Sequence, residues 1–227
     1  MAQPIFKSVR YTSRWLCYLD LLGFSALVES QSINRVIRTY GEVLRKMEQT
    51  AGPNKAGGIY YSWFSDTFIL YTRGSKREDY ARLENASRVF FETLTLKRIP
   101  VRGAITFGKL YTHLERNIFV GPALIDAYKY GEKQNWLGLL LTPSAVGRLT
   151  DVGLDPHESP YYVPVPSQGV LKRLGAKNVY AYAFNRSRKD TPNPILQSVR
   201  DMRDSVELKY RQEYEATIAF AEANQLQ

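Results

Sequence analysis

The segment CYLDLLGF, residues 17–24, decides how the rest of this chain is interpreted, because it places one acid inside an apolar run. A second segment, YYSWFSDTF at residues 60–68, has the same character and holds Asp66. Aspartate is disfavoured in strands and costly to remove from water, so packing alone does not account for Asp20 or Asp66. Two such acids suggest a site where divalent cations replace water around the carboxylates.

The segments around these acids predict an α+β fold with a ferredoxin-like βαββαβ core. Strands are expected over 14–21, 59–64, 67–72 and 101–107, with the Ser65-Asp66 turn making a hairpin of the second and third. Ser32 is expected to cap a helix whose apolar positions, Ile33, Val36, Ile37, Tyr40, Val43, Leu44 and Met47, recur at helical spacing. Asp79 is expected to cap a second helix. This order places both helices on one face of an antiparallel sheet.

Further strands and a long C-terminal helix extend the predicted core. A helix is expected over 121–135, a strand over 137–141, a short helix over 143–149, a short strand over 161–165 and a last strand over 179–184. After 192–194 (PNP), an apolar stripe from Ile195 to Ile218 predicts one long helix. It lies either across its own domain, which we prefer, or on a second copy. The predicted division is a domain over 1–190 and a helix over 191–227.

Composition narrows the classes of protein. The 227 residues are 44% hydrophobic, enough for a packed core. Cys17 is the single cysteine, no apolar run approaches the roughly 18–20 residues of a membrane span, and the N-terminus lacks a signal-peptide core. We therefore expect a cytoplasmic protein without a membrane partner. A net charge of +9 favours polyanionic partners, or alternatively serves solubility alone.

The predicted topology brings the two acids together. The first strand lies beside the third, so the end of one strand, at Asp20, meets the hairpin turn that holds Asp66. Neighbouring carboxylates repel unless a cation lies between them, and Mg²⁺ or Mn²⁺ prefers such oxygen ligands. Taken singly, Asp66 is explained as a turn residue and Asp20 as a cap after its strand. Together they favour metal binding.

Three further features are candidates for phosphate contacts. Backbone N–H groups of residues 21–25, including Gly23 and Phe24, are placed to cradle phosphates as helix N-termini do. Arg102 is the one charge in its strand, and it needs either a triphosphate or a structural carboxylate partner. Lys172 belongs to a basic cluster before the last strand, which either meets a polyphosphate or is a solvated turn.

Four segments resemble, in order and spacing, the class III nucleotidyl cyclase catalytic domain: YLDLLGF, YYSWFSDTFILY, PVRGAITFGKLY and FVGPALIDAYKYGE, within residues 12–185. The resemblance implies that Asp20, Asp66 and the Leu21 carbonyl hold two Mg²⁺ or Mn²⁺ ions. It implies that a nucleoside triphosphate is cyclised when its ribose 3′-hydroxyl attacks the α-phosphorus and expels pyrophosphate. It also implies a head-to-tail homodimer with active sites at the interface.

The chain departs from the adenylyl cyclases of that family. Their helix Asn and transition-state Arg correspond to Asp126 and Tyr130, and their adenine-reading Lys and Asp fall near residues 61–62 and Ile118. This pattern resembles the pyrimidine cyclases of the Pycsar anti-phage system, whose cyclic UMP or cyclic CMP activates a separate effector protein. The resemblance then implies UTP, or CTP, as substrate. It leaves Arg102 for the triphosphate or transition state, and Tyr61 for the base.

Three other functions stay open at this point. The missing Asn–Arg pair is compatible with a degenerate nucleotide-sensing module. The fold itself is compatible with an adenylate or guanylate cyclase. Sheet aromatics such as Tyr60 and Trp63 suggest single-stranded nucleic-acid binding, but the RNP1 pattern of such sheets is absent, so no stable nucleic-acid partner is expected.

Overall fold

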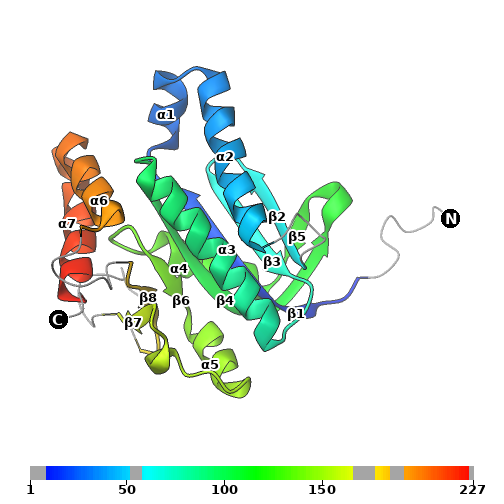
Figure 1. Ribbon diagram of the computed structural model, residues 1–227. Coiled ribbons are helices and arrows are strands. Elements are labelled where there is room, and N and C mark those ends of the chain that lie inside the picture. Colours follow the sequence, from blue (N-terminus) through cyan, green and yellow to red (C-terminus); the bar gives the residue numbers. More distant parts are fainter. Residues whose placement is uncertain (1–8, 52–57, 166–176, 185–191, 225–227) are drawn as a thin grey trace.

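The computed structural model describes residues 9–51, 58–165, 177–184 and 192–224, which fold around one mixed sheet (Figure 1). Within those ranges the sheet has eight strands, in the order β2-β3-β1-β4-β6-β8-β7, with β5 paired to β4 alone. The strands are β1 (Thr12–Leu21), β2 (Ile59–Phe64), β3 (Thr67–Thr72), β4 (Val101–His113), β5 (Ile118–Val120), β6 (Leu139–Leu141), β7 (Tyr162–Pro164) and β8 (Tyr180–Tyr182).

Helices cover both faces of this sheet. They are α1 (Phe24–Ser30), α2 (Ile33–Ala51), α3 (Arg77–Leu96), α4 (Pro122–Glu132), α5 (Pro143–Asp151), α6 (Pro194–Ser205) and α7 (Leu208–Ala223). In Figure 1, α2 and α3 cross one face, α4 lies behind the sheet, and α6 and α7 stand together at one side. No helix among the described residues combines the length and the apolar character that a membrane crossing requires.

The predicted βαββαβ core is confirmed by the pairing of β1. This strand runs antiparallel to β3 on one side and to β4 on the other, so that Asp20 faces Thr67 and Arg102. Because side chains alternate along a strand, β1 contributes to two hydrophobic layers. Leu19 packs with the α2–α3 side, and Tyr18 with the α4 side.

Helix α4 lies very close to the sheet. A Cβ at Gly131 would come within 2.6 Å of the Tyr18 ring, so only glycine permits this approach. Tyr18 also packs edge-on against Tyr128, with ring centroids 5.6 Å apart. Helix α4 therefore covers both β4 and β1 on the face that carries Asp20.

The single long C-terminal helix was a wrong prediction, because the described residues form two helices. Helix α6 ends at Ser205, whose hydroxyl donates to the Asp201 carbonyl at 2.9 Å and so competes with the helical bonding of the last turn. Val206 is extended, and α7 then returns along α6, with Arg200 and Glu222 paired at 2.7 Å. Tyr210 was expected to belong to the buried apolar stripe of the single helix, but it is 47% exposed.

Three smaller predictions near the core are also corrected. Strand β4 continues through Gly108 to His113. Asp79 is the third residue of α3 and accepts from the Lys76 N–H at 2.9 Å, so it stabilises the helix start without being its cap. Ile33 and Ile37 are 65% and 52% exposed, because α1 does not cover that side of α2.

Candidate active site

Asp20 is the next-to-last residue of β1, just before the chain leaves the sheet. Asp20 is only 8% exposed, and its Oδ2 accepts hydrogen bonds from Arg102 Nε at 3.1 Å and Nη2 at 3.0 Å. Arg102 stands directly across the β1–β4 ladder, so the register of two strands fixes this pair. Arg102 thus has a carboxylate partner within its own chain. This is the structural ion pair that was one of the two alternatives for this residue.

Asp66 approaches from the β2–β3 turn. Ser65 adopts a left-handed conformation with φ of 57°, which closes the two-residue connection between Phe64 and Thr67. The Leu21 N–H donates to the Asp66 carbonyl at 3.0 Å and ties the turn to the end of β1. The predicted meeting of the strand end with the hairpin turn is therefore present.

The electrostatics of the site show that Asp66 influences the ionisation of Asp20. Burial raises the pKa of Asp20, Arg102 opposes that rise, and the negative charges of Asp66 and Glu132 add to it. A raised pKa means that the charged form of Asp20 is less favourable here than in water. A divalent cation between the carboxylates would reverse that balance.

The donor set fits a hard divalent cation. Arg102 engages only Oδ2 of Asp20, and Oδ1 makes no hydrogen bond with any described residue. Among the described residues no group of three or more Asp, Glu, His or Cys side chains forms a metal cluster. Two carboxylates with a nearby backbone carbonyl such as that of Leu21 suit Mg²⁺ or Mn²⁺, which complete their shells with water and phosphate oxygens.

The loop after Asp20 leads straight into α1. Gly23 has φ of 67°, a left-handed conformation that favours glycine, and its carbonyl accepts from the Leu27 N–H at 3.0 Å. The Phe24 ring stacks on Tyr40 with centroids 6.4 Å apart, which fixes the start of α1 against α2. Gly23 and Phe24 are therefore held beside Asp20, and their role in phosphate binding stays a prediction.

Tyr61 is not brought to the aspartates. It shares the α2 side of the sheet with Leu70, and its hydroxyl donates to Glu48 Oε1 at 2.6 Å. The neighbouring Ser62 lies on the Asp20 side of the sheet, where its hydroxyl bonds Asn117 Oδ1 at 2.6 Å. Lys172 lies outside the described residues.

Two residues at the site were missed by sequence reasoning. Glu132, at the end of α4, adds its charge to Asp20 and accepts from the Tyr18 hydroxyl at 3.5 Å. Tyr40 is 3% exposed, and its buried hydroxyl has no hydrogen-bond partner among the described residues. Burial, and then the charge of Asp66, raise the pKa of Tyr40 to about 12. Tyr40 had looked like an ordinary core position, and only the structure places it near the turn.

A second polar cluster lies on α4, in a groove of about 540 Å³ lined by Asp126, Tyr130 and Ser144. Asp126 Oδ2 accepts from Thr106 at 2.6 Å and from the Ser144 hydroxyl, and Thr142 donates to Thr106 at 3.0 Å. Asp126 and Tyr130 thus line one groove, one turn of helix apart, on the α4 side of the sheet.

Comparisons with known proteins identify the fold. No protein-family model and no curated protein matches the chain. A guanylate cyclase domain of RhGC from Catenaria anguillulae, solved with GTP, superposes with a TM-score of 0.54 at 16% identity, covering 76% of this chain and 96% of that one. The adenylyl cyclase CyaB from P. aeruginosa gives 0.53 at 15% identity, covering 81% and 98%. A bacterial light-regulated adenylyl cyclase gives 0.50 at 12% identity, covering 86% and 100%.

The chain therefore has the fold of a class III nucleotidyl cyclase catalytic domain. The matched span includes nearly the whole of each of these domains, which agrees with the resemblance carried by the sequence segments. At these identities the likeness establishes the fold, while chemistry and substrate have to be argued from the residues of the site.

Proposed function

We propose that this protein is a divalent-cation-dependent nucleotidyl cyclase that converts UTP, or secondarily CTP, to its 3′,5′-cyclic monophosphate and pyrophosphate. The observation that carries the proposal is the convergence of Asp20 and Asp66, in a cyclase fold, at the joined end of β1 and the β2–β3 turn. Neighbours of the same fold were solved with GTP and with an ATP analogue.

Each residue of the site has a part in this chemistry. Asp20, Asp66 and the Leu21 carbonyl would hold Mg²⁺ or Mn²⁺, which when bound would supply Lewis-acid activation and charge neutralisation. The ribose 3′-oxygen bonds to the α-phosphorus, the bond from that phosphorus to the bridging oxygen breaks, and pyrophosphate leaves while the hydroxyl proton passes to solvent. Arg102 keeps Asp20 Oδ2 in place and presents its remaining guanidinium N–H groups to the triphosphate.

A pyrimidine base is supported by what the site lacks. The positions that read adenine in related adenylyl cyclases are residues 61–62 and Ile118 here, none of which offers the Lys and Asp of that pair. Because Tyr61 is turned toward Glu48, Ser62 is the better placed of the two to meet a base on the Asp20 side. A short hydroxyl side chain suits the hydrogen-bonding edge of uracil or cytosine.

The proposal includes a homodimer. Apolar side chains remain exposed on the side of the sheet that carries Asp20: Phe64 is 78%, Ile125 56% and Tyr128 45% exposed. A head-to-tail partner would cover them and would bring its own Asp126 and Tyr130 to the metal site of this copy. Apolar patches of this kind mark interaction surfaces.

A cytoplasmic location, and a separate effector protein activated by the cyclic nucleotide in anti-phage defence, complete the proposal on the basis of the resemblance.

A second candidate, a nucleotide-sensing module without turnover, is favoured by one observation. Asp126 stands where the catalytic Asn of adenylyl cyclases is expected, and its Oδ2 is already bonded by Thr106 and Ser144. A group that is satisfied within its own chain has less capacity to hold a substrate.

Incubation of the purified protein with each of the four nucleoside triphosphates and Mn²⁺ separates these candidates. We expect UTP or CTP to give a cyclic monophosphate and pyrophosphate, identified by chromatography and mass spectrometry. Preferred turnover of ATP or GTP would reject the pyrimidine assignment. Tight binding of a triphosphate, measured by calorimetry, without any product would favour the sensing module.

A further inference from the structure

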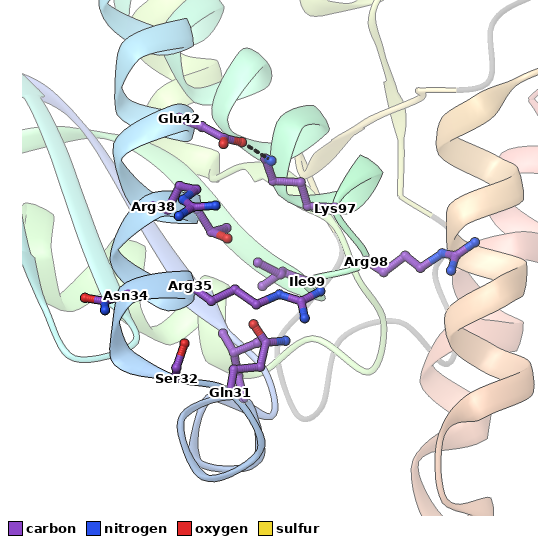
Figure 2. Close-up of a pocket in the computed structure, with 11 residues that line it drawn as sticks. Gln31, Ser32, Asn34, Arg35, Arg38, Glu42, Lys97, Arg98 and Ile99 are labelled. Atoms are coloured by element: carbon purple, nitrogen blue, oxygen red, sulfur yellow. Dashed lines mark hydrogen bonds and ion pairs between the residues drawn. The ribbon is translucent and has the colours of Figure 1, made fainter.

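A basic groove lies on the α2–α3 side of the sheet, away from the side chains of the aspartates. It measures about 610 Å³ and is bounded by the end of α1, the first turns of α2 and the connection from α3 to β4 (Figure 2). In Figure 2, Arg35 extends from α2 toward Ile99, so its guanidinium reaches across the groove. The groove is built from elements that are adjacent only in the folded chain.

The charges of this groove are unbalanced. Four cationic residues, Arg35, Arg38, Lys97 and Arg98, line it together with one carboxylate, Glu42. Glu42 is already paired with Lys97, and Arg98 reaches away to Asp201 on α6 at 2.6 Å. Neither Arg35 nor Arg38 makes a hydrogen bond or an ion pair with any described residue, although they are one helical turn apart. Like charges at that spacing repel.

The remaining lining is polar, with a small apolar floor. Gln31, Asn34 and Thr39 offer hydrogen-bonding groups around the two arginines, and the floor holds Leu27 and the buried Ile99. Arginine guanidinium groups match phosphate oxygens in a bidentate geometry. The volume lies within the range of roughly 300–1,000 Å³ that small-molecule sites occupy. The positive end of the 19-residue α2 adds to the same potential.

We propose that this groove binds a small phosphorylated ligand that carries two or more phosphate groups, held by Arg35 and Arg38. The site is independent of the cyclase reaction, because it uses no residue of the Asp20–Asp66 centre. It is nevertheless connected to that centre through the chain. Ile99 is followed by Pro100, whose carbonyl accepts from the Leu22 N–H at 2.9 Å, and then by the strand that holds Arg102. A ligand against Ile99 would be in position to influence the Arg102–Asp20 pair.

Calorimetric titration with inorganic triphosphate, in EDTA, tests the site without metal binding at the aspartates. We expect one triphosphate per chain, with binding at least about tenfold weaker in Arg35→Gln/Arg38→Gln, since two charge-assisted hydrogen bonds are lost. The control, Arg45→Gln/Lys46→Gln, removes the same charge from exposed positions of the same helix outside the groove, and it should bind like the native protein.

A second double variant tests whether the geometry of the guanidinium groups matters for binding. Arg35→Lys/Arg38→Lys keeps the charge but not the bidentate fork, so its affinity should fall between those of the native protein and the Gln variant. The exposure of both arginines predicts that all variants keep the native melting curve. Absence of triphosphate binding, or equal binding by the native protein and the Gln variant, would overturn the proposal. Either result leaves the nucleotide assay of the aspartate site unaffected.

Discussion

Arg102 and Asp20 face each other across β1 and β4, and both Nε and Nη2 of the arginine contact the same carboxylate oxygen, at 3.1 and 3.0 Å. The second oxygen, Oδ1, has no hydrogen bond to the described residues. One side chain thus holds Asp20 in a nearly buried position while leaving half of its carboxylate for another ligand.

Removal of the guanidinium should cost stability. Arg102→Gln leaves Asp20 with a weaker partner beside Asp66, and we expect the free energy of unfolding to fall by about 1–3 kcal/mol. Urea titration of the metal-free protein measures this. Arg200→Gln, which breaks the exposed pair with Glu222, is the control and should cost about 0–1 kcal/mol. Equal losses in both variants would mean that the Arg102–Asp20 pair stabilises the fold no more than an exposed ion pair does.

The pH dependence of stability should report the raised pKa of Asp20. An acid whose folded-state pKa lies above its unfolded value binds a proton more tightly when folded. Its contribution to stability is therefore largest below the unfolded pKa and is lost as pH rises through the folded pKa. We expect the native protein, relative to Asp20→Asn, to lose stability from pH 3 to 7 without divalent cations. A difference that stays flat or grows with pH would contradict the shift.

The C-terminal helices should behave as part of the domain. Phe220 of α7 packs edge-on against the buried Trp136, with ring centroids 4.3 Å apart, and the Leu137 N–H donates to Thr217 at 2.8 Å. Phe220→Ala should lower the free energy of unfolding by about 3–5 kcal/mol, in one cooperative transition. Leu208→Ala, at a position 78% exposed, should change it little. A separate early transition would instead support an independent unit over 191–227.

Exposed apolar side chains on the Asp20 side should mediate dimer formation. Phe64, at the end of β2, is 78% exposed and stands next to the Ser65-Asp66 turn. Phe64→Asp should shift the protein from dimer to monomer in sedimentation velocity, and turnover should fall with it. Leu208→Asp, a comparable charge placed on α7, should leave the dimer intact. A native protein that sediments as a monomer in the presence of triphosphate and Mn²⁺ would rule out the shared site.

The sequence was sufficient to predict the core and the meeting of Asp20 with Asp66, because the βαββαβ order admits few arrangements and the acids interrupt apolar strands. The sequence did not predict which face of the sheet Tyr61 lies on. Strand β2 carries aromatic side chains on both faces, so the alternation of its residues does not show which tyrosine packs on the α2 side. The end of α6 was also missed, since no Gly or Pro stands near Ser205 and the break depends on a hydroxyl–carbonyl bond and on packing against α7.

The groove formed by Arg35 and Arg38 was equally invisible in sequence. Their spacing is typical of a solvated helix face, and Ile33 and Ile37 looked like core residues. Only the position of α1 and of the α3–β4 connection shows that the two arginines line a cavity.

The metal-dependent cyclase activity proposed for Asp20 and Asp66 can be measured directly. Its most direct test is the rate of cyclic nucleotide formation from UTP and CTP as a function of Mn²⁺ concentration, for the native protein, Asp66→Asn and the control Asp151→Asn. We predict saturable Mn²⁺-dependent turnover in the native protein and the control, and a loss of at least about a hundredfold in Asp66→Asn with an unchanged melting curve. Undiminished turnover in Asp66→Asn, or equal turnover in EDTA, would show that the two aspartates do not hold a catalytic metal.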